Sequence, residues 1–157
     1  MSLPFYKTTS SSLKETEDLA TLFVAYLLEH RKNKREACVV GLIGDLGSGK
    51  TAFTQAVARA LGVVEHVGSP TFAIMKSYNL LGTFSMLWHI DCYRLESSQD
   101  LLALGWNNIV SNPQNLIFVE WANMVRDILP PSAILLSFSA TEENNRTIIV
   151  TTAQQEQ

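Results

Sequence analysis

The fold of this chain is constrained most strongly by one glycine-rich segment, GDLGSGKT at positions 44–51. It fits the pattern G-x-x-x-x-G-K-[ST] at every required position, with the members Gly44, Asp45, Leu46, Gly47, Ser48, Gly49, Lys50 and Thr51. The apolar run 37–43 precedes it and is typical of a strand buried on both faces. A helical pattern over 51–61 follows and ends before Gly62. A strand, a glycine-rich turn and a helix in this order predict a phosphate-binding loop.

The residue types in this segment suit the chemistry of phosphate. Glycines let the backbone turn tightly, so that its N–H groups approach phosphate oxygens, and the helix that follows points its positive dipole end at the anion. We expect the ammonium group of Lys50 to reach the β- and γ-phosphates and the hydroxyl group of Thr51 to bind Mg²⁺. No N-K-x-D-type segment that would read guanine is found in the sequence, so ATP is the favoured nucleotide.

The rest of the chain alternates between predicted strands and helices. We expect strands at 5–8, 72–78, 83–90 and 115–121, helices that begin after Ser12 and at 97–104, and a final hairpin of 133–139 and 146–151. Ser12 and Glu15 have the spacing of a capping box. The order favours an α/β fold: a three-layer, P-loop NTPase-like sandwich with a mostly parallel central sheet and antiparallel edge hairpins. Residues 1–152 are expected to form a single domain and 153–157 a frayed tail.

Two acidic residues follow apolar segments and are candidates to complete a metal site. Glu120 ends the run LIFVE, and Asp91 ends MLWHID. Both are expected at the carboxyl edge of the sheet, where open α/β folds bind their ligands. Glu120 is the better direct Mg²⁺ ligand, because its run is the more strand-like. Asp91 is expected to hold a metal-bound water or to orient the attacking water.

Two further features leave alternatives open. His89 lies two residues before Asp91, on the same face of a regular strand, and is interpreted as a core histidine or one that supports the site rather than a catalytic one. The segment Ser69-Pro70-Thr71 follows the predicted loop and helix. The Thr71 hydroxyl group can sense the γ-phosphate, as switch loops do, or the segment can be a simple turn into the next strand.

Several motifs together resemble one family, the bacterial TsaE (YjeE) ATPases of tRNA threonylcarbamoyladenosine synthesis. The matching pieces occur in the order of that family between about Gly41 and Pro130: GDLGSGKT, GVVEHVGSPTF, HIDCYRL, LGW and IFVEWA with a following LP. The glycine-rich loop alone is unspecific, whereas SPTF, H-x-D-x-YRL and VEW beside it are highly specific. The N-terminal helix and the final hairpin resemble the family in pattern only.

The resemblance implies a Mg²⁺-dependent ATPase that works with TsaD and TsaB, which attach threonylcarbamoyl to adenosine next to the anticodon. It implies that the chain drives this complex between turnovers and meets tRNA only indirectly. The family's threonine after Ser-Pro maps onto Thr71, its essential aspartate onto Asp91 and its metal-binding glutamate onto Glu120, which precedes Trp121. Asn123 stands where many members have an acid, so a contact made by that acid is not carried over.

The composition bears on whether the chain binds nucleic acid or a membrane by itself. The net charge is −3, whereas a protein that holds nucleic acid by itself is usually basic. No apolar run is long enough to cross a bilayer and the N-terminus does not resemble a secretory signal, so we expect a cytoplasmic protein without a membrane partner.

Two alternatives to the ATPase are a small-molecule kinase on a P-loop fold and a non-hydrolysing module that binds nucleotide to assemble partners. A kinase usually carries an arginine-rich lid, and no such insertion is evident.

Overall fold

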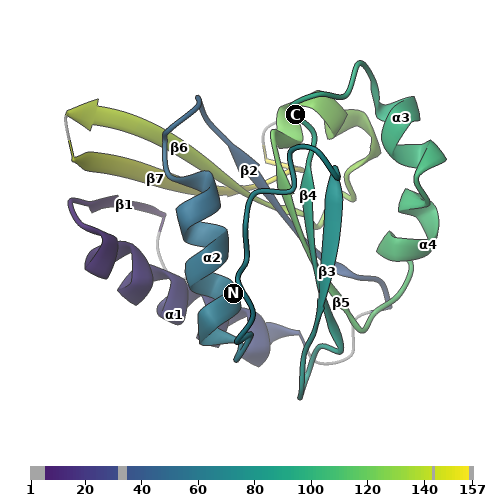
Figure 1. The fold of residues 1–157 in the computed structure, drawn as a ribbon, viewed down its shortest axis with the longest axis horizontal. Coiled ribbons are helices and arrows are strands. Elements are labelled where there is room, and N and C mark those ends of the chain that lie inside the picture. Colours follow the sequence, from purple (N-terminus) through teal and green to yellow (C-terminus); the bar gives the residue numbers. More distant parts are fainter. Residues whose placement is uncertain (1–5, 32–34, 143, 156–157) are drawn as a thin grey trace.

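The computed structural model describes residues 6–31, 35–142 and 144–155, and these residues build one mixed sheet. Its strands are β1 (Lys7–Ser10), β2 (Cys38–Ile43), β3 (Met75–Asn79), β4 (Met86–Asp91), β5 (Asn115–Glu120), β6 (Ile134–Glu142) and β7 (Asn145–Thr152). They lie in the order β1-β7-β6-β2-β5-β4-β3 (Figure 1). The inner strands β6, β2, β5 and β4 pair in parallel, and the remaining pairs are antiparallel. The expected parallel centre and antiparallel edge hairpins are therefore both present.

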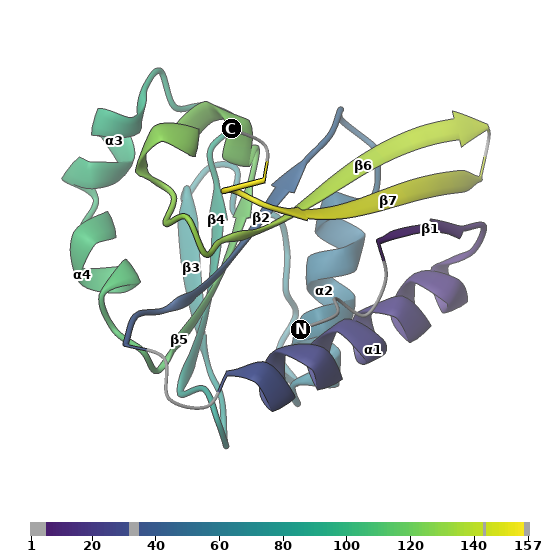
Figure 2. The ribbon, with the colours of Figure 1, turned by 180° about the vertical axis from the view of Figure 1, so that it is seen from behind.

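Helices cover both faces of this sheet. The helices α1 (Leu13–His30) and α2 (Lys50–Ala60) pack with one face in an apolar cluster that includes Phe23, Phe53 and Phe118. The helices α3 (Ser98–Ala103) and α4 (Trp106–Val110) and the 3₁₀ segment η1 (Ala122–Ile128) cover the opposite face (Figures 1 and 2). Every residue of β5 is buried, because this strand lies at the centre of the sheet with helices on each side.

The start of α1 differs in detail from the predicted capping box. The Ser12 hydroxyl oxygen accepts a hydrogen bond from the amide of Glu15 at 3.1 Å, as expected. The Glu15 carboxylate, however, accepts from the amide of Ser11 at 2.7 Å, one residue before the cap. The entry to α1 is thus held by two consecutive positions, Ser11 and Ser12, which are both bonded to Glu15.

The prediction that a strand covers 72–78 is wrong at its beginning. Residues 71–73 form a turn, and β3 starts only at Met75. Ile74 between them has a φ of 68°, outside the strand region, while its amide donates to the carbonyl of Pro70 and its carbonyl accepts from the amide of Asp91. These two bonds tie the turn to the end of β4, so the local β-propensity of FAIM is overridden by a tertiary contact.

Other boundaries also differ from the predictions. The helices α4 and η1 were not expected, and β4 begins at Met86 rather than at 83. The Ala153 side chain, placed by the sequence in a frayed tail, is buried, and its amide donates to the carbonyl of Ala133 at 2.9 Å. Position 5 of the predicted first strand and positions 156–157 of the tail lie outside the described residues.

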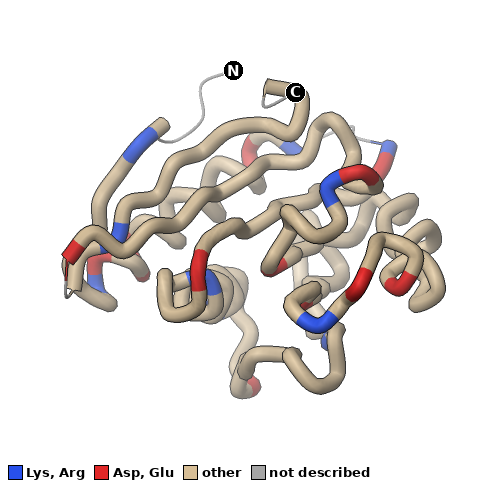
Figure 3. The backbone as a smooth tube through the Cα atoms, turned by 90° about the horizontal axis from the view of Figure 1, so that it is seen from above, with Lys and Arg blue, Asp and Glu red and all other residues tan. Residues whose placement is uncertain are grey.

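Charged residues of both signs are spread over the fold. Lys and Arg are interspersed with Asp and Glu along the described backbone (Figure 3). None of the helices in the described ranges combines the length and the apolar character that a membrane span needs.

Candidate functional site

The glycine-rich loop connects the carboxyl end of β2 to the first turn of α2. At Gly44 a Cβ atom would lie 2.5 Å from the carbonyl oxygen of Phe138, so only glycine allows β6 to pass this closely. Gly49 has a φ of 109° and forms the cap of α2, a conformation that glycine adopts without strain. The loop therefore curls over the start of an eleven-residue helix, whose free amides and dipole favour an anion at this position.

The side chain of Lys50 lies inside this loop. It is 5% exposed, and its Nζ donates to the carbonyl oxygens of Gly44 at 2.5 Å and Asp45 at 2.8 Å. The same Nζ lies 4.5 Å from the centre of the Trp121 ring, a cation–π distance. Burial lowers the pKa of Lys50, and the nearby carboxylates, Glu120 foremost, oppose that shift because they favour the charged form.

Glu120 ends β5 beside the loop and is buried. Strand register places it next to Leu42 of β2 on one side and Asp91 of β4 on the other. Its Oε1 accepts a hydrogen bond from the Thr51 hydroxyl at 2.7 Å, and its Oε2 lies 2.6 Å from His89 Nε2. The structure thus brings together the two residues, Thr51 and Glu120, that the sequence assigned to one metal.

Asp91 ends the neighbouring strand and contacts a different segment. Its Oδ2 accepts from the Thr71 hydroxyl at 2.9 Å and from the Ser69 hydroxyl at 3.4 Å, and its Oδ1 accepts from the amide of Tyr93 at 3.0 Å. The hydroxyl groups of Ser69 and Thr71 are themselves 2.7 Å apart. The segment 69–71 therefore leads into the turn at 71–73, and its hydroxyl groups meet an acid of the site. The role of Thr71 as a phosphate sensor stays a prediction.

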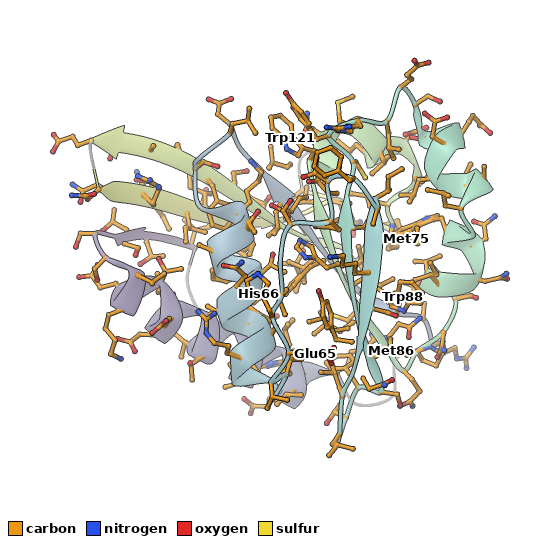
Figure 4. All side chains as sticks on the ribbon, viewed as in Figure 1. Glu65, His66, Met75, Met86, Trp88 and Trp121 are labelled. Carbon is orange, nitrogen blue, oxygen red and sulfur yellow. The ribbon has the colours of Figure 1, made fainter. Side chains whose placement is uncertain are left out.

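These residues share one cavity of about 540 Å³ at the upper end of the sheet, where Figure 4 also shows Trp121. Its walls include Leu46, Gly47, Ser48, Gly49, Lys50, Thr51, Thr71, Asp91 and Glu120. The hydroxyl oxygen of Ser48 is buried there without a hydrogen-bond partner in the described part of the chain.

Sequence reasoning missed one wall of this cavity. Residues 10–13 and Thr16, from the end of β1 and the start of α1, line it together with Arg146 of β7. Arg146 pairs with Ser10 across β1 and β7, and its aliphatic stem lies 3.8 Å from the position of a Gly49 Cβ. The serine run at 10–12 by itself indicates only a helix cap. No local pattern connects it with Arg146, which lies more than 130 positions away.

Comparison with known proteins identifies the family. The family model described as "Threonylcarbamoyl adenosine biosynthesis protein TsaE" matches residues 10–148. A relative from Bacillus subtilis, named tRNA threonylcarbamoyladenosine biosynthesis protein TsaE, is 33% identical over 88% of this chain and 80% of its own length. A relative of the same name from Treponema pallidum is 34% identical over 90% of this chain and 96% of its own length.

A solved structure supports the same conclusion. The crystal structure of Bacillus subtilis YdiB matches with a TM-score of 0.73 and 29% identity, over 96% of this chain and 86% of that one. This likeness agrees with an α/β protein that has one mixed sheet between helices. The chain belongs to the TsaE family, whose role is in tRNA threonylcarbamoyladenosine biosynthesis.

Proposed function

We propose that this chain is a Mg²⁺-dependent ATPase that serves tRNA threonylcarbamoylation in the cytoplasm together with TsaD and TsaB. One observation carries the proposal: a glycine-rich loop with a buried lysine, a hydroxyl group bonded to one acid and a second acid with its own hydroxyl donors all line one cavity. Phosphoryl transfer needs these parts, since its catalysis rests on positioning and on charge stabilisation.

The residues present fit a magnesium ion bound beside phosphate. Thr51 and Glu120 supply oxygen ligands in direct mutual contact, and Asp91 is adjacent in strand register. No group of three or more His, Cys, Asp or Glu suited to a metal is found in the described ranges. Mg²⁺ suits such a site, because it is usually held by one or two carboxylates and completes its coordination with water and phosphate oxygens. When bound, the ion would neutralise charge on the phosphates.

The other residues of the loop would hold the nucleotide. Residues 46–51 line the cavity at the start of α2, where phosphate charge would be best stabilised by the helix N-terminus and by the ammonium group of Lys50. Asp91 would accept a hydrogen bond from the attacking water and orient it toward the terminal phosphate. Thr71 would respond to that phosphate, because it lines the cavity and its hydroxyl group is bonded to Asp91.

The candidate catalytic groups lie together in one cavity. The cavity at the loop contains all of them, whereas a second cavity among the described residues, lined by residues such as Arg35 and Ser132, includes none. A small-molecule kinase would need room for an acceptor beside the γ-phosphate, and it remains the alternative function. A module that binds nucleotide without hydrolysis is the other alternative.

The decisive experiment measures ATP hydrolysis and multiple-turnover tRNA modification with limiting TsaD and TsaB, with and without this chain. We expect weak hydrolysis by the chain alone, stimulation by the two partners together, and modification that depends on the chain. Lys50→Ala should nearly abolish hydrolysis, whereas Lys76→Ala, on the exposed edge of β3, should behave as wild type. Equal modification with and without the chain would overturn the tRNA role and favour the kinase.

A further inference from the structure

A completely buried histidine stands behind the proposed metal ligand. His89 lies on β4 with no exposed surface, and its Nε2 is 2.6 Å from Oε2 of Glu120 on the adjacent strand β5. The other carboxylate oxygen, Oε1, is bonded to Thr51. Both oxygens of one side chain are therefore held, one from α2 and one from β4.

The chemistry of the two groups defines which way the hydrogen bond runs. A carboxylate only accepts hydrogen bonds, so Nε2 of His89 carries the hydrogen and donates it. The other ring nitrogen, Nδ1, is buried without a partner among the described residues. The hydrogen bond to Glu120 is therefore the one polar contact of the ring among the described residues, and its donor is Nε2.

We propose that His89 is a positioning residue that fixes the Glu120 carboxylate for its role as a metal ligand. With Oε2 held by the imidazole, the carboxylate plane cannot rotate, and Oε1 stays beside the Thr51 hydroxyl group. In other metal sites, too, a hydrogen bond from a residue that does not touch the metal orients the side chain that does. This role rests on the proposed function, in which Thr51 and Glu120 hold Mg²⁺ together.

A competing interpretation is that the imidazole only fills space in the core. Leu87→Ala offers a control for lost packing, since Leu87 is also completely buried and lies two residues earlier on the same face of β4. His89→Leu removes the donor and keeps an apolar side chain of similar size. His89→Gln keeps an N–H donor at about the distance of Nε2. These three substitutions separate the loss of a hydrogen bond from the loss of packing.

The measurement is the effect of Mg²⁺ on nucleotide affinity. A fluorescent, non-hydrolysable ATP analogue is titrated in EDTA and in saturating Mg²⁺, and the ratio of the two dissociation constants reports how strongly the protein holds the metal. We expect His89→Leu to reduce this ratio about tenfold, the size of effect seen for outer-shell partners of metal ligands. His89→Gln and Leu87→Ala should stay close to wild type, and affinity in EDTA should be unchanged in all of them.

The same titration on Glu120→Gln separates this inference from the function beneath it. A wild-type ratio in Glu120→Gln would remove Glu120 from the metal and overturn both proposals. A reduced ratio in Glu120→Gln with a wild-type ratio in His89→Leu would overturn the role of His89 alone. Equal losses in His89→Leu and His89→Gln would also overturn it, because the donor would then be irrelevant.

A spectroscopic measurement on the unmodified protein covers the case in which His89→Leu does not fold. Nitrogen-15 NMR of the three histidine rings distinguishes a hydrogen on Nε2 from one on Nδ1, and His89→Gln assigns the signal that disappears. We expect the Nε2–H form. The Nδ1–H form would leave no donor toward Glu120 and would contradict the proposal.

Discussion

Two acids stand side by side at the ends of β4 and β5, yet they are held in different ways. Glu120 is bonded by Thr51 and His89, which belong to a helix and a strand. Asp91 receives its hydroxyl donors from the segment 69–71, which leads into the turn at 71–73 and in which Ser69 is exposed. Both carboxyl groups are almost fully buried, so the difference lies in their partners and not in their access to water.

The different partners of Glu120 and Asp91 indicate different roles for the two acids in the site. Elements with many buried contacts resist rearrangement, whereas exposed turns open at low cost in free energy. A metal ligand needs a fixed position, and a group that responds to bound phosphate needs a partner that can move. The turn beside Asp91 also ends at Ile74, whose φ of 68° is costly for a β-branched residue. Glu120 therefore suits metal binding and Asp91 suits a switching or hydrolytic role.

Among the variants that test this comparison of the two acids, the largest effect is expected for Asp91→Asn. The amide keeps the shape of the side chain but cannot accept a proton or orient water as a carboxylate does, so kcat for ATP hydrolysis should fall by about 100-fold or more. Nucleotide affinity should change little, and steady-state kinetics with a separate binding titration measure the two quantities. A loss of affinity equal to the loss in kcat would show that Asp91 acts in binding.

Glu120→Gln should change a different quantity. Loss of the charge beside Thr51 should raise the Mg²⁺ concentration for half-maximal activity by at least about tenfold, with a smaller effect on kcat at saturating metal. A magnesium titration of the steady-state rate measures this. If Asp91→Asn shifts the Mg²⁺ requirement and Glu120→Gln does not, the two assignments are reversed.

A smaller effect is expected at Thr71. Thr71→Ala removes one hydrogen bond to Asp91, worth about 1 to 2 kcal/mol, and should lower the stimulation of hydrolysis by TsaD and TsaB about fivefold to tenfold. ATP affinity should stay within about twofold, as the loop 44–51 is untouched. Thr71→Ser keeps the hydroxyl group and serves as the control. Unchanged stimulation in Thr71→Ala would make this segment a simple turn.

The smallest effect concerns the strand end next to Asp91. Burial raises the pKa of the Cys92 thiol to about 12, from 9.0. As pH rises past 9 the unfolded chain releases this proton before the folded chain does, so the free energy of unfolding should decline between pH 9 and 12. Between pH 8 and 10 the decline should be about 1 kcal/mol larger in wild type than in Cys92→Ala.

Thermal unfolding at several pH values measures this last prediction. The Cys92 amide also donates to the carbonyl of Glu120 at 3.0 Å, which joins the two strand ends. Equal pH dependence in both proteins would mean that folding does not raise the pKa of Cys92, and that the strand end beside Asp91 is open to solvent rather than closed.

Part of this arrangement could be read from the sequence because it is encoded locally. The strand before Gly44, the glycine-rich turn and the helix from Lys50 follow from apolar runs, backbone freedom and periodicity within about 25 residues. Glu120 and Asp91 were placed at strand ends by the same reasoning, and the register of β4 and β5 confirms that they are neighbours. The short segments α4 and η1 were missed, because they are formed by packing against the sheet rather than by a strong local pattern.

The pairings inside the site were decided by tertiary structure alone. That Thr51 and His89 meet Glu120, while Thr71 meets Asp91, depends on strand order and on the turn at Ile74, neither of which leaves a local signal. The wall formed by residues 10–13 and Arg146 depends likewise on β1 joining the far edge of the sheet. Sequence patterns report which side chains a strand or turn presents, because steric preferences act between near neighbours. Contacts between distant segments arise only when the whole core is buried at once.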